Sequence, residues 1–120
     1  MLYRIGTVRE LQNLSLPDVV YREILRCTEI LDKEYGENRD YIQSGGYTIY
    51  CETKDDIEKV REIIDFERHP CEWTDVLYSE KGKEKEAFVS ALYLLNDDYS
   101  LVVIMPAKDA PPAIQAEMED

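Results

Sequence analysis

The chain has 120 residues and a formal net charge of −12, with 26 acidic and 14 basic side chains. Its length is typical of one domain with a single core, and 44% hydrophobic residues argue against a disordered chain. The acidity excludes binding to nucleic acid through phosphates, which requires clustered Lys or Arg, and favours a partner with a basic surface. No stretch approaches the roughly 20 apolar residues of a membrane helix. The first residues lack the layout of a secretory signal, so we expect no membrane association and a cytoplasmic location.

Two short elements are expected at the start of the chain. Residues 2–5, Leu-Tyr-Arg-Ile, have the composition of a short strand. Thr7 and Glu10 have the Ser/Thr-x-x-Glu spacing of a capping box, in which the two side chains satisfy free backbone amides of a first helical turn. This spacing predicts a short helix that ends near Leu14.

The clearest helix is predicted over residues 16–35. Ser15 suits its cap, Pro17 fits the first turn, and Gly36 is a residue type that commonly follows a helix. One helical face carries side chains that suit a core, at intervals of three or four residues: Val20, Ile24, Cys27, Leu31 and Tyr35. This stripe predicts a helix packed on a sheet, with the thiol of Cys27 in the core.

A β-hairpin is predicted over residues 40–52, with a Gly-Gly pair at 45–46 as its turn. Paired glycines adopt the positive φ angles that a two-residue hairpin turn requires. Because side chains alternate along a strand, Tyr47 and Tyr50 in the second arm point to opposite faces. We expect Tyr50, together with Tyr41 in the first arm, on an exposed aromatic surface.

A second helix and a third strand follow. Thr53 suits the cap of a helix that ends near Phe66, and acidic residues in its first turn complement the positive end of the helix dipole. Residues 73–79 are the next predicted strand, and the crossover through the helix would let this strand pair parallel to 47–52. The charged segment 80–86 is expected to be an exposed connection.

The longest apolar run, residues 87–105, is predicted to be a β-hairpin with its turn at 96–98. Both arms are rich in β-branched, aromatic and aliphatic residues, and the Asn-Asp-Asp turn tolerates left-handed backbone. Apolar side chains point to both faces, so these strands should lie centrally in the sheet with a covering on each side. Pro106 ends the second arm because it cannot donate to a ladder. We interpret the run as scaffold, since it contains no reactive group beyond serines and turn carboxylates.

The order of these elements predicts an α+β fold. We expect a mainly antiparallel sheet of about five strands with two principal helices packed on one face. A single domain should occupy residues 1–106, and residues 107–120 should form an acidic C-terminal tail.

Residues that could carry chemistry are few. The chain has three Cys, at 27, 51 and 71, and one His, His69. Zinc sites usually show closely spaced ligand pairs, and only His69 and Cys71 are close in sequence. Two residues apart on an extended segment, they point to opposite faces, which disfavours a Cys/His thiol catalyst. No phosphate-binding loop or hydrolase motif is present, so we predict no catalytic residues, no metal and no cofactor.

Tyrosine is the main anomaly in the composition, with nine Tyr and one Trp against two Phe. Tyr is enriched where a surface must be both wet and adhesive, although these rings would also serve as core residues or cross-strand pairs. The acidic residues before and within the second helix would equally serve as caps. Our candidates for an interaction surface are Tyr41, Tyr47, Tyr50, Glu52, Asp55, Asp56, Trp73 and Tyr78.

These features lead to the hypothesis of a small, acidic, non-catalytic binding or inhibitory protein that engages a basic protein partner. A phage or mobile-element protein that blocks a basic host target is one setting for such a role. The alternative is a small-molecule-binding or sequestering protein, a homo-oligomer with a pocket at a subunit interface. An enzyme is the third class, and the lack of catalytic motifs disfavours it.

Overall fold

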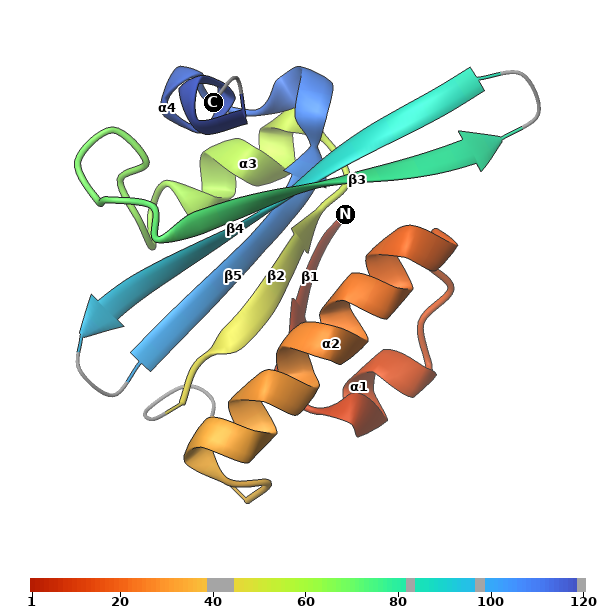
Figure 1. Cartoon of the computed structure of the whole chain (residues 1–120), viewed down its shortest axis with the longest axis vertical. Coiled ribbons are helices and arrows are strands. Elements are labelled where there is room, and N and C mark those ends of the chain that lie inside the picture. Colours follow the sequence, from red (N-terminus) through yellow and green to blue (C-terminus); the bar gives the residue numbers. More distant parts are fainter. Residues whose placement is uncertain (39–44, 82–83, 97–98, 119–120) are drawn as a thin grey trace.

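A five-stranded sheet lies at the centre of the computed structural model, which describes residues 1–38, 45–81, 84–96 and 99–118 (Figure 1). The strands are β1 Leu2–Ile5, β2 Tyr47–Cys51, β3 Trp73–Lys81, β4 Glu84–Asn96 and β5 Tyr99–Pro106. They lie in the order β1-β2-β5-β4-β3, with β2 and β5 parallel and the other neighbouring pairs antiparallel. The predicted α+β class and the mainly antiparallel sheet are confirmed.

Helices cover both faces of the sheet. The helices α1 (Val8–Gln12) and α2 (Asp18–Tyr35) pack on one face, while α3 (Lys54–Val60) and α4 (Pro112–Met118) pack on the other. Figure 1 shows the sheet passing between these two layers. The expected packing of both principal helices on one face is not found, because α2 and α3 lie on opposite faces.

The central strand β5 explains why two layers are needed. Its side chains from 101 to 105 are all buried, and they alternate between two cores. Val102 and Ile104 pack under α1 and α2, and the core on the other face contains Leu101, Val103 and Met105. Burying one such side chain contributes about 1.5–3 kcal/mol relative to leaving it exposed. A single helical layer would forfeit this contribution on the open face, so the apolar pattern on both sides of this strand requires two.

Helix α2 ends at Tyr35 as predicted, but it starts at Asp18, two residues later than predicted. Pro17 holds the N-cap position with no side-chain hydrogen bond, so Ser15 is not the cap. The residue before a proline is disfavoured in the helical region of φ and ψ, which keeps Leu16 outside the helix. At the other end Gly36 follows with a φ of 94°, as predicted.

Side-chain caps start α1 and α3. Thr7 accepts a hydrogen bond from the amide of Glu10 at 3.3 Å, and Thr53 accepts one from the amide of Asp56 at 3.3 Å. Each bond satisfies a backbone donor that has no partner inside the helix. Both N-cap residues are confirmed, but the Glu10 carboxylate accepts from the Thr7 hydroxyl at 3.2 Å and does not complete the predicted box.

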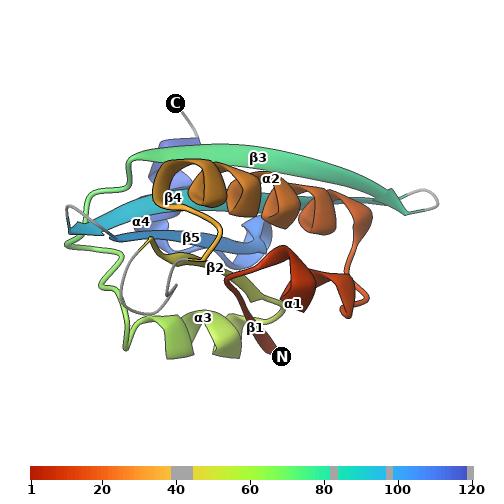
Figure 2. The same ribbon diagram turned by 90° about the horizontal axis from the view of Figure 1, so that it is seen from below.

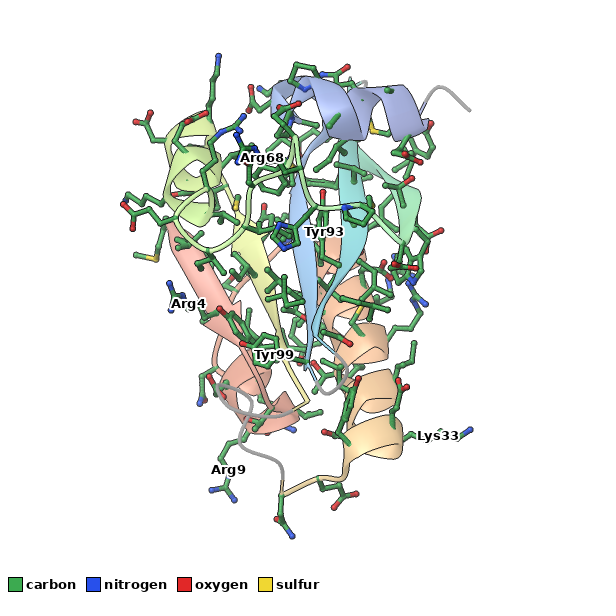
Figure 3. All side chains as sticks on the ribbon, turned by 90° about the vertical axis from the view of Figure 1, so that its left-hand side faces the viewer. Arg4, Arg9, Lys33, Arg68, Tyr93 and Tyr99 are labelled. Atoms are coloured by element: carbon green, nitrogen blue, oxygen red, sulfur yellow. The ribbon has the colours of Figure 1, made fainter. Side chains whose placement is uncertain are left out.

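Helix α3 is shorter than predicted, ending at Val60 rather than near Phe66. The chain continues in tight turns, in which the amide of Ile63 donates to the carbonyl of Val60 at 2.8 Å. Ile64 and Phe66 nevertheless stay buried, and the ring of Phe66 packs on Tyr93 with centroids 5.9 Å apart. Figure 3 shows Tyr93 among the side chains of the sheet. The apolar pattern that predicts a longer helix therefore continues through irregular chain.

Strands β3 and β4 form a longer ribbon than predicted. The sequence predicts a connection over residues 80–86, but residues 80–81 and 84–86 belong to the two strands, because the ladder continues to Lys81 opposite Glu84. The pairing of β4 with β5 stops at Phe88, opposite Pro106, and beyond it β4 pairs with β3 alone. The ribbon therefore projects past the end of β5, as Figures 1 and 2 show.

The predicted hairpin over 87–105 is confirmed, since β4 and β5 are antiparallel neighbours. Its turn residues 97–98 lie outside the described residues, as does the first arm of the other predicted hairpin, 40–44. The glycines at 45 and 46 have φ angles of 91° and 88°. Both values agree with the positive φ expected there.

Strand β2 has a different parallel neighbour from the predicted one. β3 lies at the far edge of the sheet, and β5 pairs with β2, placing Ile49 opposite Val103. Where this pair begins, Gly46 lies against the backbone of Ser100, and an ideal Cβ at Gly46 would be 1.6 Å from the Ser100 carbonyl oxygen. The absence of a side chain at this position allows the two strands to approach.

The segment after Pro106, predicted as an acidic tail, packs against the sheet. It forms the 3-10 turn η1 (Ala107–Asp109) and then α4. Ala110 and Ile114 are buried in the core shared with α3, and Gln115 Nε2 donates to the carbonyl of Ala110 at 3.2 Å. This segment therefore helps to close one face of the fold.

Candidate binding cavity

The aromatic members of the predicted interaction surface do not lie together. Tyr41 is outside the described residues. Tyr47 and Tyr50 are both buried, and they enter the cores on opposite faces of the sheet. The expected exposure of Tyr50 is wrong, because α1 and α2 cover the face to which it points. Trp73 is half-buried and Tyr78 is 66% exposed, both on the edge strand β3.

The acidic members lie around the start of α3, where Glu52 and Asp55 are exposed and Asp56 is buried. The Asp56 carboxylate accepts hydrogen bonds from the amides of Glu52 at 3.0 Å and Thr53 at 3.1 Å, and lies 3.0 Å from the Met1 ammonium. Burial alone would raise the pKa of Asp56, but these bonds outweigh it and hold the pKa below its usual value. Asp56 therefore supports α3 and is not available to a partner.

Tyr50 is held between two other rings. Tyr3 stacks on it with centroids 5.9 Å apart and planes 16° apart, and Phe88 approaches at 6.3 Å in an edge-on geometry. Aromatic pairs of this kind contribute roughly 0.5–1.5 kcal/mol beyond the area that they bury. The ring of Tyr50 is thus fixed by neighbours from β1 and β4.

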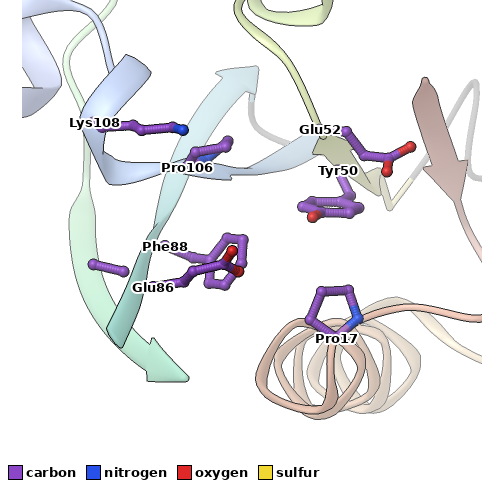
Figure 4. Close-up of a pocket in the computed structure, with 8 residues that line it drawn as sticks. Pro17, Tyr50, Glu52, Glu86, Phe88, Pro106 and Lys108 are labelled. Carbon is purple, nitrogen blue, oxygen red and sulfur yellow. The ribbon is translucent and has the colours of Figure 1, made fainter. Parts of the chain in front are cut away.

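A cavity of about 580 Å³ lies beside Tyr50, where β2 and β5 end (Figure 4). Because β2 and β5 are parallel, their carboxyl ends meet at the same end of the sheet, and the start of α2 and the base of the β3–β4 ribbon complete the walls. The volume is within the range of roughly 300–1,000 Å³ that is typical of ligand sites. The lining residues are Pro17, Tyr50, Glu52, Glu86, Ala87, Phe88, Pro106 and Lys108.

The aromatic side of the cavity is electrostatically negative. Burial raises the pKa of Tyr50 to about 12, and the carboxylates of Glu52 and Glu86 add to this shift. Two carboxylates, one directly after β2 and one on β4, thus act on one phenol, and this arrangement favours a positive charge near the ring. Lys108 extends from the opposite wall, next to Pro106 (Figure 4).

The carboxylates of Glu52 and Glu86 differ in their contacts with neighbouring groups. Glu52 lies 3.3 Å from the Met1 ammonium, and burial together with a hydrogen bond to Glu52 raises the pKa of Tyr3. Glu86 is exposed and, within the described part of the chain, takes part in no ion pair; the same holds for Lys108. Of the two, Glu52 is thus the carboxylate that described neighbours already hold.

The three thiols and the histidine lie away from this cavity. Cys27 and Cys51 are buried in opposite cores, and burial raises the pKa of each to about 12, so both stay protonated at neutral pH. The Cys71 thiol donates to the carbonyl of Trp73 at 3.2 Å, while His69 is exposed. Among the described residues, no group of three or more His, Cys, Asp or Glu is placed to hold a metal ion.

Most of the cavity could not be found from the sequence. Tyr50 and Glu52 are among the predicted interaction residues, but Glu86, Phe88 and Lys108 are not. These groups come from segments that are far apart in the chain, and only the strand order brings them together. The one local signal is Phe88 in the apolar run, and that pattern indicates burial rather than a site.

Comparisons with protein-family models, with curated proteins and with solved structures found no match for this chain. In the part of the chain that the structure describes, no helix has the length and apolar character needed to cross a membrane.

Proposed function

We propose that this chain is a small, acidic, non-catalytic binding protein that engages a basic protein partner, and that the cavity beside Tyr50 receives a basic side chain of that partner. The observation that carries the proposal is the pairing of an aromatic floor, Tyr50 and Phe88, with two carboxylates, Glu52 and Glu86. The net charge of −12 also favours a basic partner, since it attracts a basic surface over a longer range than the cavity does.

The chemistry of the lining suits an ammonium or guanidinium group. Carboxylates form charge-assisted hydrogen bonds with such groups, and aromatic faces attract them through the ring quadrupole. An arginine side chain could extend into the cavity beside Tyr50 and pair its planar head with Glu86. Lys108 on the opposite wall would disfavour a second cation and could hold a carboxylate of the same partner. In a cytoplasmic setting such as a phage-infected cell, occupation of a basic host protein in this way would be inhibitory.

A double variant tests the proposal. We expect E52Q/E86Q to lower affinity for a fluorescent arginine-rich peptide by about tenfold or more, because each charge-assisted hydrogen bond contributes roughly 1.5–3 kcal/mol. The matched control is E34Q/E62Q, which removes the same two charges from exposed positions outside the cavity. Anisotropy titrations of both variants and the parent give the affinities. Equal losses in the two variants would mean that net charge alone drives binding and that the cavity is not the site.

The size of the cavity favours a second candidate, binding of a free small organic cation. At about 580 Å³ the cavity would accept a molecule larger than one side chain. Native mass spectrometry of the protein purified from its natural host distinguishes the two: a retained small molecule supports the second candidate, and its loss in E52Q/E86Q assigns it to this cavity. A homo-oligomer with the pocket at its interface would instead appear as a stable multimer.

A further inference from the structure

The strand β3 presents a long free edge, independent of the cavity. It is the outermost strand of the sheet and pairs only with β4 in the described part of the chain. None of its side chains from 73 to 79 is buried, whereas the central strand β5 is buried from 101 to 105. Figure 2 shows β3 at the margin of the molecule, with no strand beyond it. The other edge, β1, has only four residues.

Proteins usually guard such an edge with charged side chains, because unpaired backbone groups attract another strand. From Trp73 to Ser79 the only charged residue is Asp75, and Arg26 of α2 binds its carboxylate at 3.1 Å. Arg26 also lies over the ring of Trp73, 5.4 Å from its centroid. Arg26 also binds the carboxylate of Glu23 at 2.7 Å, so Asp75 is only partly neutralised, but its side chain is drawn toward α2 and away from the edge.

From this unguarded edge we infer that β3 pairs antiparallel with β3 of a second copy of the chain, joining the two sheets into one. A two-fold axis at Val76 makes the strand its own partner and keeps each face of the sheet continuous. Thr74 then lies opposite Tyr78 of the other copy, twice, which is a favourable β-branched and aromatic pair. Asp75 faces Leu77 rather than its own equivalent, so no like charges oppose each other between residues 73 and 79; beyond them, Glu80 of one copy lies opposite Glu72 of the other.

The ionic-strength dependence separates this pairing from binding to a basic partner. Two chains of net charge −12 repel each other, and salt screens that repulsion. The dimer should therefore tighten as salt rises from about 0.01 M to about 1 M, where the Debye length falls from roughly 30 to 3 Å. Binding of a basic partner to the acidic protein should weaken over the same range.

Paired charge variants test the register by sedimentation equilibrium of the full chain. T74K/Y78K places an ammonium opposite an ammonium across the two-fold axis and should raise the dimer dissociation constant at least about tenfold, whereas T74E/Y78K places opposite charges together and should restore the dimer. The control I30K puts a lysine at an apolar position, 45% exposed, on α2 and should leave the dimer unchanged. Circular dichroism checks that each variant is folded.

A parent protein that is monomeric at all concentrations and salt levels would overturn the proposal, as would a T74K/Y78K dimer as stable as the parent dimer. A monomer that binds an extended peptide along β3 would overturn it in favour of a different partner. Neither result bears on the cavity, because Thr74 and Tyr78 are not among its lining residues.

Discussion

The identity of a single residue determines how closely β2 and β5 can approach each other. Two features require glycine at position 46. Its φ is 88°, and a Cβ added there would lie 1.6 Å from the carbonyl oxygen of Ser100. The sequence predicts the positive φ from the Gly-Gly pair, because turn geometry is a local property. It does not predict the contact with Ser100, because that contact depends on the parallel pairing of β2 with β5.

Gly46→Ala should therefore destabilise the protein by about 2–4 kcal/mol, from left-handed strain and displaced backbone together. Gly36→Ala is the matched control: its φ is 94°, but no atom lies within 4 Å of an added Cβ. It should cost only the strain, about 1–2 kcal/mol. Urea unfolding of both variants measures the difference. Equal losses of unfolding free energy in the two variants would show that the backbone at Ser100 moves to accommodate the added Cβ at low cost.

At the scale of elements, local patterns predict the starts of α1 and α3 but not the end of α3, whereas for α2 they predict the end at Gly36 and miss the start. The caps Thr7 and Thr53 are confirmed because a cap depends on residues within one turn. The end of α3 was not predictable, since Ile64 and Phe66 are buried after the helix has stopped. Similarly, the length of the β3–β4 ribbon depends on cross-strand pairing that continues through charged residues.

The start of α3 should make stability depend on acid pH. The folded state holds the pKa of Asp56 below its usual value, so its contribution is fully present above the unfolded pKa of about 3.9 and is lost as pH falls through the lower folded pKa. Asp56→Asn should be less stable than the parent at neutral pH, and this deficit should shrink as the pH falls below about 3.9.

Thr53→Ala is the control for this titration. It removes the hydrogen bond to the amide of Asp56, costing about 1 kcal/mol, but it removes no titrating group from the cap. Its deficit should therefore persist where that of Asp56→Asn disappears. Urea unfolding at a series of pH values compares the two, and a pH-independent deficit for Asp56→Asn would contradict the assigned role of the carboxylate.

At the scale of the whole molecule, the division of the helices between two faces determines both the core and the cavity. The apolar residues of 87–105 predict a covering on each face of the sheet, and the structure has helices on both faces. The prediction that both principal helices pack on one face conflicts with this apolar pattern. The structure agrees with the pattern, because α2 and α3 lie on opposite faces. The interpretation of this run as scaffold is incomplete, because Ala87 and Phe88 also form a wall of the cavity.

The cavity itself is a property of the strand order. Tyr50 lies near the end of β2 and Glu52 follows it, Glu86 and Phe88 lie on β4, and Lys108 follows β5. No spacing in the sequence relates these three groups, because the crossover from β2 to β5 passes through α3, β3 and β4. The sequence shows the acidity and the surplus of tyrosine. The position at which a carboxylate lies beside an aromatic ring can be located only from the fold.

The most direct test of the central claim is a titration of the isotopically labelled protein with arginine amide, followed by two-dimensional amide NMR. The account predicts saturable shifts at residues 50, 52, 86–88 and 108, which line the cavity, and loss of those shifts in E52Q/E86Q. Shifts spread over the exposed acidic residues of α2 and α3, and unchanged in that variant, would show that the cavity is not a binding site for cations.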